Sequence, residues 1–268
     1  MVMPFNKRFA RIKSRHPSHG VLRKRNGSGI LCDHLAVVRF GSSTPSSIPV
    51  QVNSIEAIKN SSNKIRMKEC FDTVGVQTPE WYETVDQVVD AQENEVGILD
   101  KPVVAKLIYG SRGAGMRLLK NMDELQEFAE INKHRLSRWY FEQYYNYTKE
   151  YRLHVAAGIG CFYTNRKMLK ADTPDDQRWY RNNSNSVWFM EDNEQFDKPD
   201  TWDVIINDCM AARASCNLDF GACDVRVNKA GDWKIIEINS APSFGEVTEQ
   251  KYREVIPQLV NLKAELSN

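Results

Sequence analysis

Long apolar runs and a secretory leader are both missing from this sequence. No segment approaches the roughly 18 consecutive apolar residues that a membrane-spanning helix needs, so we expect no membrane partner. The basic residues near the start are not followed by an apolar stretch, so no signal peptide is expected. These absences predict an intracellular, cytoplasmic protein.

Cysteine pairs are missing as well. Six cysteines are scattered along 268 residues, and none stands in a C-x-x-C pair. This spacing argues against a zinc centre and indicates reduced, buried thiols rather than disulfides. The hydrophobic content of 41% and the charged content of 26% are typical of a globular protein. A chain of this length can bury the core of one large domain or of two to three subdomains.

Acidic residues are absent from the first 32 positions. The rest of the chain holds 28 of the 36 basic residues and all 35 acidic ones, a net charge of −7. A basic arm on an acidic body could bind an anionic partner such as nucleic acid. The alternative is a flexible, solvated terminus, and no nucleic-acid motif accompanies the arm. Its basic residues are Lys7, Arg8, Arg11, Lys13, Arg15, Arg23, Lys24 and Arg25.

A hairpin near the C-terminus carries the clearest chemistry. Residues 222–227 and 233–239 have the composition of two strands around a turn that contains Gly231. Because side chains alternate along a strand, Glu237 and Asn239 point to the same face. Both bring oxygen atoms to it.

The register of this hairpin decides what faces Glu237. With the turn centred on residues 230–231, Asp224 falls opposite Glu237, while Ile236 and Ile238 point to the other face. Two carboxylates this close need a proton or a cation between them, and oxygen ligands suit Mg²⁺ or Mn²⁺. Since Mg²⁺ fills its remaining positions with substrate phosphates, the hairpin predicts a metal–nucleotide site. An ordinary solvated acidic face is the alternative.

A glycine loop follows a buried-type strand at residues 102–109. The loop, residues 110–115, is not a Walker A loop, because Met116 and Arg117 stand where Lys and Ser or Thr should follow, and it leads into a strand. Glycines let backbone N–H groups wrap an anion, so we expect a hairpin flap over phosphates, with a simple hairpin turn as the alternative. Lys106 lies inside the apolar strand and should have an anionic partner.

The remaining pattern alternates strands and helices. Helix 63–71 ends at Gly75, and the aromatic strand 139–145 could present the polar edges of Glu142 and Gln143 to an adenine. Residues 170–185 lack apolar periodicity and predict a long functional loop. Further strands are expected at 35–40, 80–82, 116–119, 150–157 and 161–168, and further helices at 54–60, 84–96, 123–133, 202–216 and from about 248, with a kink or break at Pro257.

These motifs in this order resemble the ATP-grasp superfamily over roughly residues 54 to 250. The likeness is to carboxylate–amine ligases of the ribosomal-protein glutamate ligase and glutathione synthetase kind. It implies an α/β fold in which two α+β subdomains clamp a nucleotide, with a shortened N-terminal domain, since only about fifty residues precede Ser54. The implied regions are a basic N-terminal region (1–53), a helical linker (54–96), a lid subdomain with the glycine loop (97–145) and a C-terminal subdomain with the metal site (146–268).

The resemblance also implies roles for individual residues. Asp224, Glu237 and Asn239 match the metal ligands of the family, which implies two Mg²⁺ or Mn²⁺ ions at this site. Arg152, Lys167, Arg181 and Asn182 match catalytic positions near the phosphates and the reacting carboxylate. ATP contacts are implied for Lys64, Lys106, Gly110, Ser111, Arg112, Gly113, Ala114, Gly115, Glu142, Gln143, Tyr144, Tyr145 and Glu150.

The implied activity is ATP-dependent ligation. A carboxylate is activated as an acyl phosphate and joined to an amine or thiol, with release of ADP and phosphate. The acceptor is left open as an amino acid, a peptide or a larger anionic molecule. Two alternatives stand beside it: a phosphotransferase, for which His154 is the histidine nearest the site, and a module that binds ATP or nucleic acid without turnover.

Overall fold

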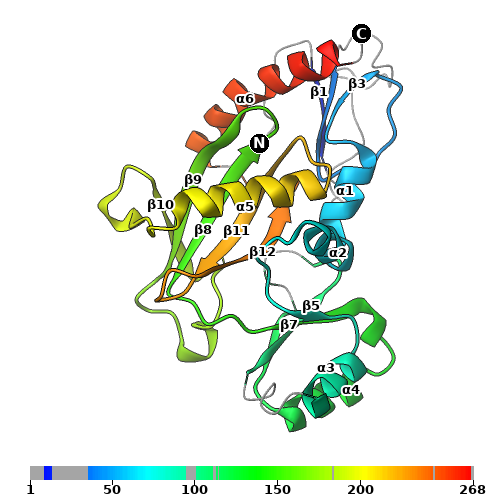
Figure 1. Cartoon of the computed structure of the whole chain (residues 1–268), viewed down its shortest axis with the longest axis vertical. Coiled ribbons are helices and arrows are strands. Elements are labelled where there is room, and N and C mark those ends of the chain that lie inside the picture. The colour runs from blue at the N-terminus through cyan, green and yellow to red at the C-terminus, as the bar shows by residue number, and fades with distance from the viewer. Residues whose placement is uncertain are drawn as a thin grey trace.

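The computed structural model describes residues 9–13, 36–94, 101–110, 113, 115–182, 184–243 and 245–266, with backbone alone for 9–13 and 92–94. These residues form three sheets with helices packed against them, stacked along the long axis of the molecule (Figure 1). No helix among the described residues is long and apolar enough to cross a membrane.

The first sheet is parallel and has three strands, β1 (Phe9–Lys13), β2 (Ala36–Phe40) and β3 (Val50–Val52). The long helix α6 (Glu246–Glu265) lies beside it at the top of Figure 1. Its Tyr252 and Ile256 share an apolar core with Phe40 and Val52. A kink or break was predicted at Pro257; the helix continues through this residue, so it is not broken there.

Strand β1 was not expected from the sequence. It includes Arg11 and Lys13, so the backbone of this part of the basic arm is a strand paired with β2. The other basic residues of the arm lie outside the described residues, and so does its suggested contact with nucleic acid.

The central sheet is antiparallel, in the order β10 (Ser186–Met190), β9 (Gly160–Leu169), β8 (Lys149–Ala156), β11 (Phe220–Val227) and β12 (Trp233–Asn239). Helix α5 (Trp202–Ser215) crosses one face of this sheet (Figure 1). Helices α1 (Ile55–Ser62) and α2 (Lys64–Val74) precede the sheet in the chain, and α2 joins its core through Met67 and Phe71. Gly75 ends α2 in the left-handed conformation (φ 71°), as its position predicts.

A four-stranded antiparallel sheet forms the lower part of Figure 1, in the order β4 (Trp81–Tyr82), β7 (Trp139–Gln143), β5 (Val103–Leu107) and β6 (Arg117–Leu119). Helices α3 (Val85–Asn94) and α4 (Met122–Asn132) cover one face. The core beneath them takes in Val103, Ala105 and Phe141. Because side chains alternate along a strand, the polar neighbours Lys106 and Glu142 belong to the opposite face.

The predicted register of the β11–β12 hairpin is correct. Asp224 pairs with Glu237, and the next pair is Val225 with Ile235, so a bulge leaves Ile236 as an extra residue in β12. The bulge changes one expectation, because Ile236 lines the same cavity as Glu237 instead of pointing away from it. Ile235 and Ile238 take the core positions.

Candidate functional site

A cavity of about 540 Å³ collects residues from α1, α2, β5, the glycine loop and the central sheet. This volume falls in the range of small-molecule binding sites. Most of the predicted site residues line it: Lys64, Lys106, Gly110, Gly113, Glu150, Arg152, Lys167, Arg181, Asn182, Asp224, Glu237 and Asn239.

Other predicted residues lie elsewhere. Glu142, Gln143, Tyr144, Tyr145 and Gly115 are not among the residues that line the cavity. Tyr145 donates its hydroxyl hydrogen to the carbonyl oxygen of Asp232 (2.8 Å). The backbone N–H of Tyr144 donates to the carbonyl oxygen of Pro102 (2.7 Å). Ser111, Arg112 and Ala114 of the glycine loop lie outside the described residues.

The two facing carboxylates are each paired with a cation. Both Asp224 oxygens accept hydrogen bonds from the fork of Arg152, at 2.7 and 2.8 Å. Glu237 accepts one from Lys64 (2.7 Å) and one from the amide of Asn239 (3.0 Å). Burial acts to raise the pKa of Glu237, but the ammonium of Lys64 outweighs it and holds that pKa well below its usual range. Glu237 is therefore ionised at neutral pH.

Glu150 is held between two further cations. This buried residue of β8 pairs with Lys167 of β9 and with Arg226 of β11, whose Nε lies 3.1 Å from its Oε2. Burial would raise the pKa of Glu150, yet the two cations lower it to about 2. Arg226 also lies over the Tyr147 ring, 4.1 Å from its centroid.

Arg226 was not predicted as a site residue. The signal was present, because Arg226 stands two positions after Asp224 on one strand and so belongs to the same face. It lines the cavity.

Lys106, which lines the cavity, belongs to a buried charge triad with Glu142 and Lys68. Glu142 accepts hydrogen bonds from Lys106 (2.6 Å) and pairs with Lys68 of α2 (2.9 Å), and Tyr140 donates to it at 3.3 Å. Burial would raise the pKa of Glu142, but the two ammonium groups lower it to about 2. The same burial lowers the pKa of Lys106 to about 8, against the opposing attraction of Glu142. Lys106 thus has the anionic partner that its place in an apolar strand predicts.

Lys68 is the member of this triad that sequence reasoning missed. Its side chain is fully buried, and it also donates to the Thr78 hydroxyl. Lys68 follows Lys64 by four residues, which places both on one face of α2. That spacing could have identified it.

The long polar loop contributes Arg181 and Asn182. Arg181 donates to the carbonyl oxygen of Thr148 (3.1 Å) and lies 4.4 Å from the centroid of the Tyr147 ring. Its Nε and Nη1 are buried and have no hydrogen-bond partner among the described residues. Unpaired buried donors beside a cavity suit an anionic ligand. Asn182 accepts hydrogen bonds from the backbone N–H groups of Ser184 and Asn185, so it also fixes the loop.

Cations outnumber anions on the described walls of the cavity. Three lysines and three arginines line the cavity, which makes six cations. The anions are three carboxylates, those of Glu150, Asp224 and Glu237. The excess of three positive charges favours a polyanion such as a nucleotide phosphate chain.

The donor set also fits a hard divalent cation. Asp224 and Glu237 each retain oxygen lone pairs beyond those used by Arg152 and Lys64, and Asn239 donates through nitrogen and keeps its amide oxygen. No cluster of three or more His, Cys, Asp or Glu that could hold a metal occurs among the described residues. Two carboxylates and an amide are the small protein contribution typical of Mg²⁺, which takes its other ligands from phosphates and water.

His154 does not line this cavity. It is 1% exposed, and its Nδ1 lies 3.0 Å from the hydroxyl of Tyr252. Burial, with the nearby Arg152 guanidinium, lowers the pKa of His154 to about 3. The imidazole is therefore neutral near pH 7, and it lines a smaller neighbouring cavity.

Sequence comparison gives short, distant matches. No model of a known protein family matches the chain. The alpha subunit of mitochondrial methylcrotonoyl-CoA carboxylase from Dictyostelium discoideum is 27% identical over 118 residues, 44% of this chain and 15% of that protein. Carbamoyl-phosphate synthase from Methanobrevibacter smithii is 28% identical over 96 residues, 35% of this chain and 25% of that protein. The chain thus spans at most a quarter of the length of these relatives.

Structural comparison covers far more of the chain. D-alanine–D-alanine ligase from Bacillus anthracis superposes with a TM-score of 0.64 at 14% identity, over 87% of this chain and 82% of that one. N5-carboxyaminoimidazole synthetase from Staphylococcus aureus, complexed with ADP, superposes with a TM-score of 0.64 at 15% identity, over 85% of this chain and 61% of that one. The ATP-grasp ligase PsnB, complexed with a minimal precursor, superposes with a TM-score of 0.57 at 14% identity, over 86% of this chain and 79% of that one. The chain has the ATP-grasp fold, as its sequence motifs predicted.

Proposed function

We propose that this chain is an ATP-dependent ligase that joins a carboxylate to an amine or thiol through an acyl phosphate, releasing ADP and phosphate. The observation that carries the proposal is the larger cavity, in which six cationic side chains surround the facing pair Asp224 and Glu237. Similar structures were solved with ATP, for the Bacillus anthracis ligase, and with ADP, for the Staphylococcus aureus synthetase. Both support ATP as the nucleotide.

The cations of the cavity would hold the phosphate chain. Lys64 and Lys106 enter from α2 and β5, and Lys167 and Arg226 enter from the central sheet. Charge-assisted hydrogen bonds from such groups are stronger than neutral ones. Asp224, Glu237 and Asn239 would hold one or two Mg²⁺ ions, which when bound neutralise charge on the β- and γ-phosphates.

Arg152 and Arg181 would act at the reacting carboxylate. In the first step a carboxylate oxygen attacks the γ-phosphorus and the bond to the β,γ-bridging oxygen breaks, giving an acyl phosphate and ADP. Arg181 has two free buried donors for the charge that builds up on the transferred oxygens.

In the second step the amine attacks the acyl carbon, loses a proton and displaces inorganic phosphate. Arg152 lies at the junction of the two cavities, where it can stabilise the oxyanion of the tetrahedral intermediate. The glycine loop, of which Gly110 and Gly113 line the cavity, would close over the phosphates and exclude water.

The test is acceptor-dependent release of ADP and phosphate from Mg²⁺-ATP, measured with pooled amino acids, peptides and nucleic acids. Glu237→Gln should lower the rate by about 100-fold or more, because it removes one of the two facing carboxylates. Asp232→Asn makes the same charge change at the exposed hairpin turn and should leave the rate unchanged.

Product analysis separates the ligase from its alternatives. An amide or thioester in the mass spectrum supports the proposal, whereas a stable phosphorylated product would identify a phosphotransferase. Binding of ATP without release of ADP in any pool would favour a non-catalytic module. AMP as the main nucleotide product would exclude the acyl-phosphate route.

A further inference from the structure

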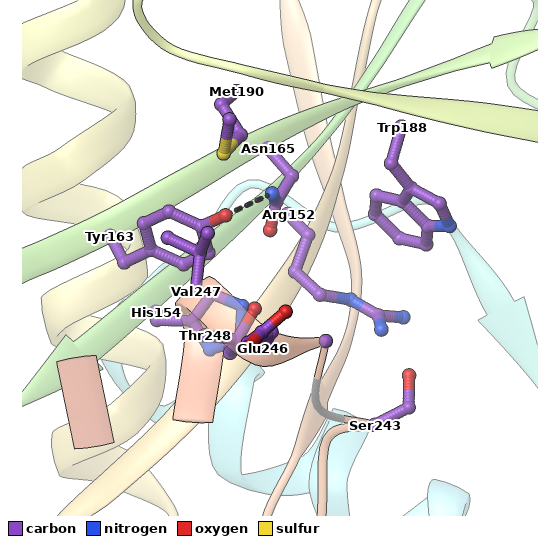
Figure 2. A pocket seen from close by; sticks show the side chains of 11 residues that line it. Arg152, His154, Tyr163, Asn165, Trp188, Met190, Ser243, Glu246, Val247 and Thr248 are labelled. Carbon is purple, nitrogen blue, oxygen red and sulfur yellow. Dashed lines mark hydrogen bonds between the residues drawn. The ribbon is translucent and has the colours of Figure 1, made fainter. Parts of the chain in front are cut away.

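A second cavity, of about 270 Å³, opens beside the nucleotide cavity and shares Arg152 and Ser243 with it. Figure 2 shows the Tyr163 ring on one side and the Trp188 ring on the other, with Arg152 and Asn165 between them. Its volume lies just below the usual range for drug-sized ligands, which suits one small molecule. A molecule seated here reaches the nucleotide cavity past Arg152.

Three adjacent strands build the floor of this cavity. Arg152 of β8 pairs with Asn165 of β9, and Asn165 pairs with Met190 of β10, so one row of the sheet supplies all three. His154 and Tyr163 form the next row. The strand pairing therefore fixes the arrangement of the floor without any ligand.

The walls are mainly apolar and aromatic. Tyr163, Trp188, Met190 and Val247 supply them, and Met190 and Val247 remain 40% and 41% exposed. His154 adds no charge, because the pKa of its imidazole is lowered to about 3. An apolar side chain of a ligand would therefore meet matching surfaces.

Two charged side chains line the cavity, Arg152 and Glu246. Two of the Arg152 nitrogens bind Asp224, and Ser243, which also lines the nucleotide cavity, lies on the side of the guanidinium (Figure 2). Glu246 begins α6 with an exposed carboxylate that forms no ion pair with any described residue. One cation and one carboxylate in an otherwise uncharged, mainly apolar cavity are complementary to a zwitterion with an apolar side chain.

We infer that this cavity binds the carboxylate donor of the ligase and that the donor is an amino acid with an apolar side chain. Its carboxylate points past Arg152 toward the nucleotide, its ammonium pairs with Glu246, and its side chain lies against Trp188, Tyr163 and Met190. The inference rests on the proposed function, since the carboxylate oxygen attacks the γ-phosphorus of ATP and releases ADP as an aminoacyl phosphate forms.

Hydroxylamine identifies the donor without knowledge of the natural acceptor, because it attacks an acyl phosphate to give a hydroxamate. The full chain with Mg²⁺-ATP and hydroxylamine should form hydroxamates from leucine, methionine or phenylalanine. The kcat/KM for aspartate, glutamate or lysine should be at least tenfold lower. The analogues that lack the amino group, 4-methylpentanoate and 3-phenylpropanoate, should also be at least tenfold poorer than leucine and phenylalanine.

Two variants at exposed positions test the contacts. Glu246→Lys should lower kcat/KM for leucine by tenfold or more but leave that for 4-methylpentanoate within twofold, and Met190→Glu should weaken both compounds. Glu254→Lys makes the same charge reversal further along α6, where Glu254 pairs with Lys251 at the surface, and should change neither. Preference for a charged amino acid, or unchanged kinetics in both cavity variants, would overturn the inference.

Binding measured by saturation-transfer NMR separates failure of this inference from failure of the proposed function. If no hydroxamate forms from any acid, the ligase proposal fails, and the cavity is judged by whether apolar amino acids receive magnetisation from the protein. Signals that disappear in Met190→Glu and persist in Glu254→Lys would still support an amino-acid site. Equal signals in both variants, or none in the wild type, would contradict it.

Discussion

Lys106 shows how one buried charge depends on its neighbours. Its ammonium is buried, which lowers its pKa to about 8; Glu142 acts to raise that pKa, and the nearby ammonium of Lys68 acts to lower it. Lys106 therefore changes charge close to physiological pH, although an unperturbed lysine does not. A lysine proposed to hold a phosphate is effective only while it is protonated.

The lowered pKa of Lys106 predicts how the use of ATP depends on pH. The kcat/KM for ATP should fall as pH rises through about 8, because Lys106 loses its proton there. Lys68→Met removes a positive charge that lowers the pKa of Lys106, so the fall should move to higher pH. Lys59→Met, which removes an exposed lysine of α1 paired with Glu56, should leave the profile in place. A shift toward lower pH in Lys68→Met would contradict the assignment.

At the scale of the element, α2 carries the first lysine of the site directly after its cap. The Asn63 side chain accepts hydrogen bonds from the backbone N–H groups of Ile65 and Arg66 and donates to the hydroxyl of Tyr109 at 3.0 Å. The backbone N–H of Lys64 donates to the carbonyl oxygen of Ile108 (3.1 Å). The cap thus fixes where the Lys64 side chain enters the cavity.

Loss of this cap should affect stability and binding together. Asn63→Ala should lower the free energy of unfolding by about 1 kcal/mol, the usual cost of an N-cap, and should raise KM for ATP more than it lowers kcat. Asn63→Asp retains an acceptor oxygen and should restore most of the stability in urea unfolding. If the alanine variant unfolds at the wild-type urea concentration, the cap does not stabilise α2.

Local signals made some elements predictable from the sequence. The turn at Gly231 and the two-residue period placed Asp224 opposite Glu237, and Gly75 marked the end of α2. Both depend on neighbours in the chain. The bulge at Ile236 was not predictable in this way, since it appears only when the two strands are paired.

Other elements depend on distant partners. β10 is an edge strand whose side chains show no clean alternation of buried and exposed positions, and its pairing with β9 defines it. β1 lies in a basic segment without an apolar run and exists through its pairing with β2. Trp188 and Met190 of the smaller cavity were missed with β10. Long-range pairing, absent from any local pattern, accounts for these omissions.

At the scale of the whole molecule, a buried charge triad joins two packing units. Lys68 lies on α2, which belongs to the central core, whereas Glu142 and Lys106 lie on β7 and β5 of the four-stranded sheet. The side chains of Lys68 and Glu142 are 0% and 2% exposed, so the pair is shielded from solvent. The relative placement of α2 and β5 in turn sets the separation of Lys64 and Lys106.

The triad should respond asymmetrically to substitution. Glu142→Gln leaves two buried ammonium groups without their counterion and should lower the free energy of unfolding at pH 7 by about 3–5 kcal/mol. Lys68→Met should cost less than half as much, because Glu142 keeps Lys106 at 2.6 Å and the methionine keeps much of the apolar stem packed. Urea unfolding of both variants measures the difference, and equal losses would show that the triad does not act as a unit centred on Glu142.

The carboxylate of Glu142 also fixes the direction in which the stability of the folded chain changes with pH. Its pKa is about 2 in the folded chain against an ordinary 4.5, so its stabilising contribution is complete above about 4.5 and is lost as pH falls toward 2. The stability gap between wild type and Glu142→Gln should therefore narrow progressively below pH 4.5, while it stays constant between pH 5 and 7. A gap that widens on acidification would require the pKa of Glu142 to be higher in the folded chain than the ordinary 4.5, which two lysines within 3 Å of its oxygens oppose.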